Sequence, residues 1–260
     1  AHNCHAHQAD DDLSGVMVGI GAMKRLAAMP GRKNEYRLLL CPEHLGTVFY
    51  LGTRGLPSNT AGTIFLETLG GYSSLCFQES FWGRSFLDCA TAIVIKPLAE
   101  RQLGIVPQWG HLFRTLIGND ETVWEAPGYE VPCVTLARSP RQNYHMLGKD
   151  TPQSLSRENL GESVEAVLAI VDHLEHQGEI KNNHRGLVCL SNPSFNLYVH
   201  RGTDPSVQED GNEGWYMLMT RLPRYVVAGW TIGMMATQHG LKVEQVQDYL
   251  NRWRDKNLLK

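Results

Sequence analysis

The chain has 260 residues, of which 42% are hydrophobic and 20% are charged. These are ordinary values for a globular protein with a sizeable core, and they exclude a disordered, collagen-like or coiled-coil chain. The formal net charge of −3 excludes a strong global field that would draw the chain onto nucleic acid or an anionic membrane.

The first part of the chain alternates helix-like and strand-like segments. Residues 14–29 carry apolar side chains at helical spacing, with N-cap chemistry from Asp11, Asp12 and Ser14 and with Pro30-Gly31 as a stop. Residues 36–41 are a short apolar run before Pro42, which is typical of a buried strand. In chain order we then expect an element at 48–51, paired strands or a strand and a loop at 64–69 and 72–77, a helix at 85–98, a strand at 131–136 and an amphipathic helix at 160–174. This alternation predicts an α/β fold, a mixed sheet flanked by helices.

The composition shifts near Gly178, so we divide the chain into residues 1–178 and residues 179–260. The second part begins with a connecting segment and a polar loop, and its tail from Trp215 predicts three successive helices. Three helices with a short closing element are typical of a helix-turn-helix or winged-helix domain. Because the tail is only mildly basic, we interpret it as a packing or oligomerisation module and expect no DNA binding.

The cysteines and the longest apolar runs indicate the compartment. No two of the six cysteines form a CxxC pair, so they are interpreted as reduced, mostly buried thiols. No apolar run approaches the ~18 residues of a membrane span, and no basic start leads into an apolar stretch. We therefore expect a cytoplasmic protein with no membrane partner.

The first fifteen residues are dense in side chains that bind metals, yet no folded scaffold precedes them. Site residues are usually held by rigid elements, which predicts that this chain is truncated or processed. An upstream segment or another chain would then complete the fold.

Within this segment, His5 and Asp11 can place an imidazole and a carboxylate on one cation. Zinc takes such ligands at ~2.0–2.2 Å, and its catalytic sites usually combine three protein ligands with water. The natural distant ligand is His145, which follows Tyr144 in a loop after a strand candidate.

Glu43 follows the apolar run of residues 37–41, and sites gather at the carboxyl ends of strands in open α/β sheets. A carboxylate there can take a proton from a metal-bound water.

These segments together resemble one family. Residues 4–15, CHAHQADDDLSG, are similar to a "CHP…ANDNxSG" segment, and residues 36–51 are similar to "YRFLFxPExIGSIxYL". Residues 118–121, Gly-Asn-Asp-Glu, are similar to "GSDE", and Tyr144-His145 to "YHT". The motifs are those of bacterial aminopeptidase-like proteins related to zinc leucyl-type aminopeptidases, which carry a C-terminal winged-helix domain and a long region before the first histidine.

The resemblance implies roles for individual residues. It implies that His5, Asp11 and His145 bind metal and that Glu43 is the general base. It also implies that Asp120, Tyr144 and Asp150 bind or orient substrate or ligands. The sequence departs from the family pattern at Ala6 in place of Pro, at Asp10 and Asp12 in place of Asn, and at Met146 in place of Thr.

The expected metal count follows from a further departure. The Glu-Glu pair of the classical aminopeptidases is Glu43-His44 here, and the second-site aspartate has no clear counterpart, with only Gln78-Glu79 nearby. We therefore expect one zinc ion. The unremarkable alternatives are that His2 and His7 are bystanders, that Asp10 and Asp12 cap a helix, and that Asp120 and Asp150 form surface salt bridges.

The sequence therefore predicts a zinc metallopeptidase or amidohydrolase, a homo-oligomer acting on a small peptide or amide with a free amino end. Two alternatives stay open. One is an amidase or deacylase of a non-peptide metabolite, and the other is a catalytically dead fold that senses a ligand while its tail binds DNA.

Overall fold

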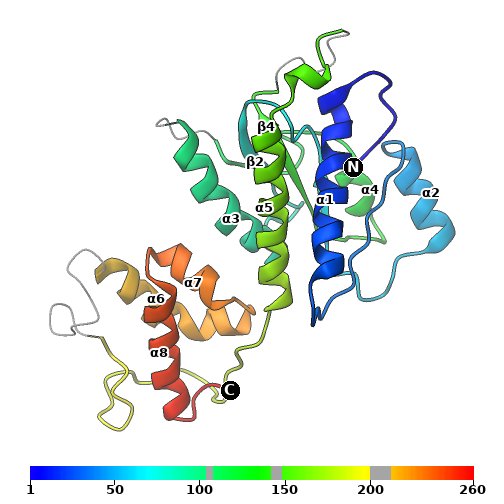
Figure 1. The fold of residues 1–260 in the computed structure, drawn as a ribbon. Coiled ribbons are helices and arrows are strands. Elements are labelled where there is room, and N and C mark those ends of the chain that lie inside the picture. Colours follow the sequence, from blue (N-terminus) through cyan, green and yellow to red (C-terminus); the bar gives the residue numbers. More distant parts are fainter. Residues whose placement is uncertain (104–107, 142–147, 200–211) are drawn as a thin grey trace. The chain divides into compact units, whose positions relative to one another are not determined.

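The structure is a computed structural model and describes residues 1–103, 108–141, 148–199 and 212–260 (Figure 1). The chain forms two compact units, Ala1–Asp172 and His173–Lys260. This division lies close to the boundary expected at residue 178. No helix in the described ranges is both long and apolar enough to cross a bilayer.

A four-stranded mixed sheet forms the centre of the first unit. Its strands are β1 (Thr63–Leu66), β2 (Ser74–Gln78), β3 (Gly110–His111) and β4 (Cys133–Ser139), in the spatial order β1-β4-β2-β3. β4 pairs in parallel with β1 and antiparallel with β2, and β2 pairs in parallel with β3. The predicted mixed α/β sheet is confirmed at this level. The two segments near residues 64–69 and 72–77 do form strands, but β4 lies between them.

Helices cover both faces of this sheet. All five residues of β2 and the first six of β4 are buried, and successive side chains of a strand point to opposite faces. The helices of this unit are α1 (Gly15–Ala28), α2 (Leu45–Arg54), α3 (Phe86–Leu103), α4 (Glu121–Trp124) and α5 (Arg157–Glu175), with short irregular turns at η1 (Ala9–Ser14) and η2 (Pro152–Ser154). Helices α1 and α5 lie side by side (Figure 1), joined by an ion pair between Arg25 and Glu165.

The prediction of a strand at residues 36–41 is wrong. This segment is extended but half-buried or exposed, and its ladder contact is a single parallel bridge between Cys41 and His2. An apolar run becomes a buried strand only where neighbouring strands pair with it, and that pairing is not local in sequence. Residues 48–51 lie within α2, whose first residue is Leu45.

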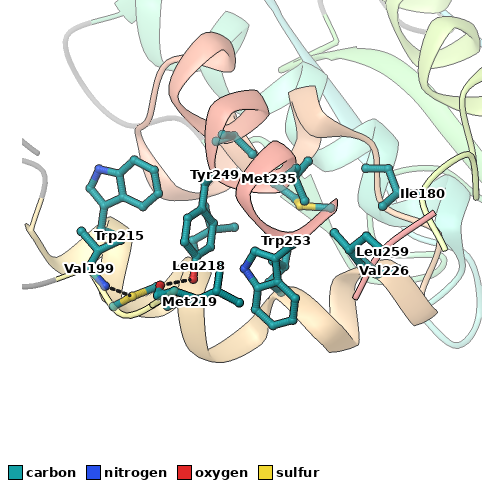
Figure 2. Close-up of a cluster of buried hydrophobic side chains, with 14 of the residues drawn as sticks. Ile180, Val199, Trp215, Leu218, Met219, Val226, Met235, Tyr249, Trp253 and Leu259 are labelled. Carbon is teal, nitrogen blue, oxygen red and sulfur yellow. Dashed lines mark hydrogen bonds between the residues drawn. The ribbon is translucent and has the colours of Figure 1, made fainter. Parts of the chain in front are cut away.

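The second unit is a helical bundle with its own core. Its helices are α6 (Asn212–Val227), α7 (Ile232–His239) and α8 (Val243–Asp255), which confirms the three predicted helices. Thr231 caps the start of α7, and Gly240 ends it in the left-handed conformation that favours glycine (φ 62°). Figure 2 shows Leu218, Tyr249 and Trp253 packed in the core of this unit. The strands of a wing are not found among the described residues of this unit.

Candidate metal centre

The candidate site lies where two parallel strands end. Glu67 directly follows β1, and Arg141 comes two residues after β4, so both lie at the carboxyl edge of the same strand pair. Ligand sites of α/β sheets occur at such edges. The N-terminal segment reaches this edge through the bridge between His2 and Cys41, and the Asn3 N–H donates to the Cys41 carbonyl (3.2 Å).

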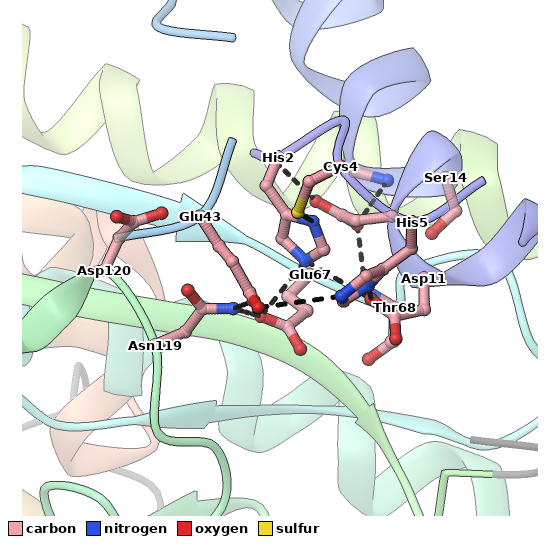
Figure 3. Close-up of polar contacts among 12 residues, drawn as sticks. His2, Cys4, His5, Asp11, Ser14, Glu43, Glu67, Thr68, Asn119 and Asp120 are labelled. Atoms are coloured by element: carbon pink, nitrogen blue, oxygen red, sulfur yellow. Dashed lines mark hydrogen bonds and ion pairs between the residues drawn. The ribbon is translucent and has the colours of Figure 1, made fainter. Parts of the chain in front are cut away.

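Two imidazoles converge on one carboxylate oxygen. His2 Nε2 lies 3.2 Å and His5 Nδ1 lies 3.1 Å from Asp11 Oδ1, and the two rings meet edge to face (Figure 3). The His2 side chain is fully buried, and that of His5 is partly exposed. Burial alone would raise the pKa of Asp11, but the two imidazoles outweigh it and the pKa is lowered. Asp11 is therefore an ionised carboxylate between two imidazole nitrogens.

The neighbouring Asp12 fixes the backbone around this pair. Its Oδ1 accepts hydrogen bonds from the N–H groups of Gly15 (3.0 Å) and Thr68 (3.1 Å), and its Oδ2 accepts one from His2 N–H (3.1 Å). Burial raises the pKa of Asp12 well above its usual range. Asp12 therefore ties together the N-terminal segment, the start of α1 and the end of β1.

Asp150 holds the backbone of the loop that carries Asp11. Its two carboxylate oxygens accept the backbone N–H groups of Asp10 (2.7 Å) and Asp11 (3.0 Å). Asp150 thus orients the loop that carries Asp11, and these contacts are with peptide groups.

Ser14 does not cap α1 through its side chain. Its hydroxyl is engaged elsewhere, since it donates to the Asp10 carbonyl and accepts the Leu69 N–H, while Asp12 accepts the Gly15 N–H.

Glu43 comes to the same cluster from the loop before α2. Its Oε1 lies 3.6 Å from His5 Nε2, its Oε2 accepts a hydrogen bond from Asn119 Nδ2 (2.9 Å), and its side chain is 34% exposed. The turn after Glu43 is held by Asp120, whose Oδ1 accepts the His44 N–H (2.9 Å). Asp120 therefore orients the segment that presents Glu43. His44 itself belongs to neither metal-capable group among the described side chains.

Glu67 is a site residue that sequence reasoning missed. Its side chain is 1% exposed, with Oε2 accepting from Asn119 Nδ2 (3.0 Å) and lying 3.9 Å from His2 Nε2. Arg141 Nη1 lies 3.7 Å from Glu67 Oε1. Burial, aided by the negative charge of Asp11, raises the pKa of Glu67 to about 8. The available signal was an acid directly after the apolar run of residues 64–66.

Glu79, the acid that the sequence offers as a counterpart of the second-site aspartate, does not lie near Glu67. Gln78 ends β2 and uses its Oε1 to accept the N–H groups of Leu116 and Ile117, and Glu79 follows it. Because β2 runs antiparallel to β4, the carboxyl end of β2 lies at the opposite edge of the sheet. Strand direction, which the sequence does not state, therefore decides which acid reaches the site.

Backbone strain marks the same region. His7, His44 and Thr68 have positive φ angles of 62°, 51° and 49°. This conformation is unfavourable for residues with a Cβ and especially so for a β-branched threonine. Such residues often occur at functional sites, where the surrounding contacts hold them in place.

The residues present fit a divalent cation. His2, Asp11 and Glu67 are all buried and present ligand atoms within 4.8 Å of one another, and His2, Cys4 and His5 form a second such group. His2 Nε2 and Asp11 Oδ2 are buried, and neither takes part in a hydrogen bond within the described ranges. The distances of 3.1 and 3.2 Å match the separation of about 3.3 Å between two ligands of a tetrahedral zinc ion.

Two of the residues expected at the site cannot be placed relative to it. Tyr144 and His145 lie outside the described residues, as does Met146. The structure therefore brings together His5, Asp11 and Glu43 from the predicted set and adds His2, Glu67 and Asn119. Asp120 and Asp150 hold the backbone of the segments that carry Glu43 and Asp11.

The chain belongs to a family defined by a domain of unknown function (DUF4910), whose model matches residues 1–177. A search of curated proteins gives no match. The fold is similar to the crystal structure of a "putative peptidase" from Clostridium acetobutylicum, with a TM-score of 0.70 and 18% identity over 100% of this chain. The chain spans 56% of the length of that protein.

A second, more distant similarity is to an aminopeptidase from Aneurinibacillus sp. strain AM-1. Its TM-score is 0.45 at 16% identity, covering 64% of this chain and 39% of the other. At 18% identity the likeness to the Clostridium acetobutylicum structure establishes the fold alone, and the chemistry of the chain has to be argued from the site.

Proposed function

We propose that the protein is a zinc-dependent hydrolase that cleaves a peptide or amide bond, in the manner of an aminopeptidase. The observation that carries this proposal is the convergence of His2, His5, Asp11 and Glu67 at one sheet edge, beside the partly exposed carboxylate of Glu43.

The proposed ligands are Asp11 and His5, as the sequence predicts, together with Glu67 and His2 from the structure. His145 remains a proposed ligand from the sequence resemblance. Cys4 is not included, because the partial burial of its thiol raises the pKa of that group, which disfavours the ligating thiolate.

Glu43 is proposed as the general base. A bound zinc ion would supply a Lewis acid for the scissile carbonyl and would acidify a water molecule. Glu43 would accept a proton from water at Oε1, because this oxygen faces His5 Nε2 (3.6 Å) while Oε2 is oriented by the hydrogen bond from Asn119. It would then donate the proton to the leaving amine. The 34% exposure of Glu43 leaves it accessible to substrate.

Hydrolysis of aminoacyl anilides, measured on zinc-loaded protein, tests this function. We expect the parent to hydrolyse them and Glu43→Gln to lose about 10²–10⁴-fold in kcat, because the amide cannot accept the proton. Zinc content should be unchanged. The matched control is Glu165→Gln, which removes an exposed carboxylate paired with Arg25 on the outer helices and should keep full activity.

The outcome also separates the alternatives. Activity only on N-acylated substrates would favour a deacylase over an aminopeptidase. A parent that binds zinc but hydrolyses neither anilides nor acyl-amines would contradict the proposed hydrolase.

A further inference from the structure

One amide group joins the two glutamates of the site. Asn119 Nδ2 donates hydrogen bonds both to Glu43 Oε2 (2.9 Å) and to Glu67 Oε2 (3.0 Å), as Figure 3 shows. Asn119 is buried, with 3% of its surface exposed. Glu43 comes from the loop before α2 and Glu67 from the end of β1, so a single side chain couples two separate segments.

The chemistry of the amide explains its orientation. An NH₂ group has two hydrogens, one for each carboxylate, whereas a flipped amide would place its oxygen against two carboxylates. Asn119 Oδ1 is buried and accepts no hydrogen bond within the described ranges. A buried acceptor without a partner costs stability, which indicates that this residue is placed for its nitrogen.

The backbone around Asn119 is itself fixed. The Asn119 N–H donates to both oxygens of the buried carboxylate of Glu121 (2.9 and 2.7 Å). The next residue, Asp120, accepts the His44 N–H beside Glu43. These backbone contacts therefore hold the side-chain nitrogen Nδ2 of Asn119 at a defined point between Glu43 and Glu67.

The two hydrogen bonds set the orientation of both carboxyl groups. With both Oε2 atoms held by Asn119, Oε1 of Glu43 faces His5 Nε2 (3.6 Å) and Oε1 of Glu67 faces Arg141 Nη1 (3.7 Å). Glu67 Oε2 also lies 3.9 Å from His2 Nε2.

We infer that Asn119 is a positioning residue that sets the separation and orientation of Glu43 and Glu67, and thereby couples the proposed general base to the proposed metal ligand. The inference rests on the proposed function. A serine hydroxyl at this position would have one hydrogen for only one of the two carboxyl groups. The asparagine therefore provides a link that serine cannot make.

A double-mutant cycle on zinc affinity tests the link to Glu67. The variants are Asn119→Leu, which keeps the branched shape but removes the donors, Glu67→Gln, and the two combined, each titrated with zinc against a competing chelator. We expect Asn119→Leu to weaken zinc binding about 10–100-fold, as is typical when a partner of a ligand is removed. The double variant should bind zinc no more weakly than Glu67→Gln alone.

A second cycle on kcat tests the link to Glu43. We expect Asn119→Leu to lower kcat with little change in KM, and to have no further effect in a Glu43→Gln background. Asn119→Ser should recover part of the loss in only one of the two cycles, because it has one hydrogen to donate. The control is Asn182→Leu, which removes an amide donor to the Pro223 carbonyl in the second unit and should change neither measurement.

The outcomes separate the inference from the proposed function. A parent that binds zinc but does not hydrolyse amides, with non-additive zinc affinities, overturns the function and keeps the link to Glu67. Additive effects in both cycles overturn the inference and leave the function standing. A parent that binds no zinc overturns both.

Discussion

At the scale of single residues, the site contains two acids whose environments push their pKa values apart. The pKa of Asp11 is lowered by two imidazoles, whereas that of Glu67 is raised to about 8 by burial. Near neutral pH, the metal-free protein therefore holds an ionised Asp11 beside a protonated Glu67. Such pairs are typical of sites in which neighbouring carboxyl groups have different roles.

The raised pKa of Glu67 predicts a pH dependence of stability. The folded state keeps the proton up to about pH 8, whereas an unfolded glutamate releases it near its ordinary value of 4.5. Between these values the folded state binds more protons, so the contribution of Glu67 to stability falls as the pH rises through this window. The limiting slope is about 1.4 kcal/mol per pH unit.

Urea denaturation of chelator-treated protein from pH 5 to pH 8 measures this effect. We expect the unfolding free energy of Glu67→Gln to fall less steeply with rising pH than that of the parent, since glutamine does not titrate. Glu165→Gln, at the surface, should follow the parent. Identical pH profiles for the parent and Glu67→Gln would show that Glu67 is ionised in the folded protein.

The residues found by sequence reasoning were those with a local or motif signal. His5 and Asp11 are close in the chain, and their contact was predicted. His2 was interpreted as a bystander because nothing in the sequence shows that its side chain turns into the protein. Glu67 was missed because its position depends on which strand ends at which edge of the sheet.

At the scale of elements, carboxylates rather than a regular ladder hold the loop before α1. Asp12 accepts three backbone N–H groups, Asp150 accepts two, and Asp10 accepts that of Gly70 (2.8 Å). A buried backbone N–H group without a partner costs stability, so these acceptors hold the loop in place. The acidic cluster predicted to cap a helix therefore has a wider structural role, since it fixes the backbone on both sides of Asp11.

Gly15 is the tightest point of this arrangement. A Cβ at this position would overlap Asp12 Oδ1 and the Leu66 carbonyl oxygen, so Gly15→Ala should displace Asp12 and the backbone it holds. We expect a loss of about 1–3 kcal/mol in unfolding free energy and weaker zinc binding. Urea denaturation and zinc titration measure the two effects.

The matched control is Gly52→Ala in α2, where a Cβ would meet open space. Because alanine is the better helix former, this variant should gain up to about 1 kcal/mol and bind zinc as the parent does. Equal zinc affinity in Gly15→Ala and Gly52→Ala would contradict the role assigned to the loop.

The elements themselves were predictable where their signal is local. Helices α1, α3 and α5 follow from apolar periodicity within one segment. The extended segment at residues 36–41 did not become a strand, because pairing depends on partners far away in the sequence. The short elements β3 and α4 have too few residues to produce a periodic pattern.

At the scale of the whole molecule, the chain combines a sheet-containing unit with a helical unit, each with its own buried core. In the second unit, Leu218 is fully buried. We expect Leu218→Ala to reduce the unfolding free energy by about 2–5 kcal/mol, through lost apolar burial and the cavity left behind. Urea denaturation measures this loss, and an effect below about 1 kcal/mol would contradict a well-packed core.

The most direct test of the proposed metal centre is the zinc content of the purified protein, measured by elemental mass spectrometry without added metal. Parent protein, His5→Ala, Glu67→Gln and His7→Ala would be compared, the last being an exposed histidine in the same segment. We predict about one zinc ion per chain in the parent and in His7→Ala, and a clear loss in His5→Ala and Glu67→Gln. Metal-free parent protein with an intact fold, or equal zinc in all four proteins, would contradict the account.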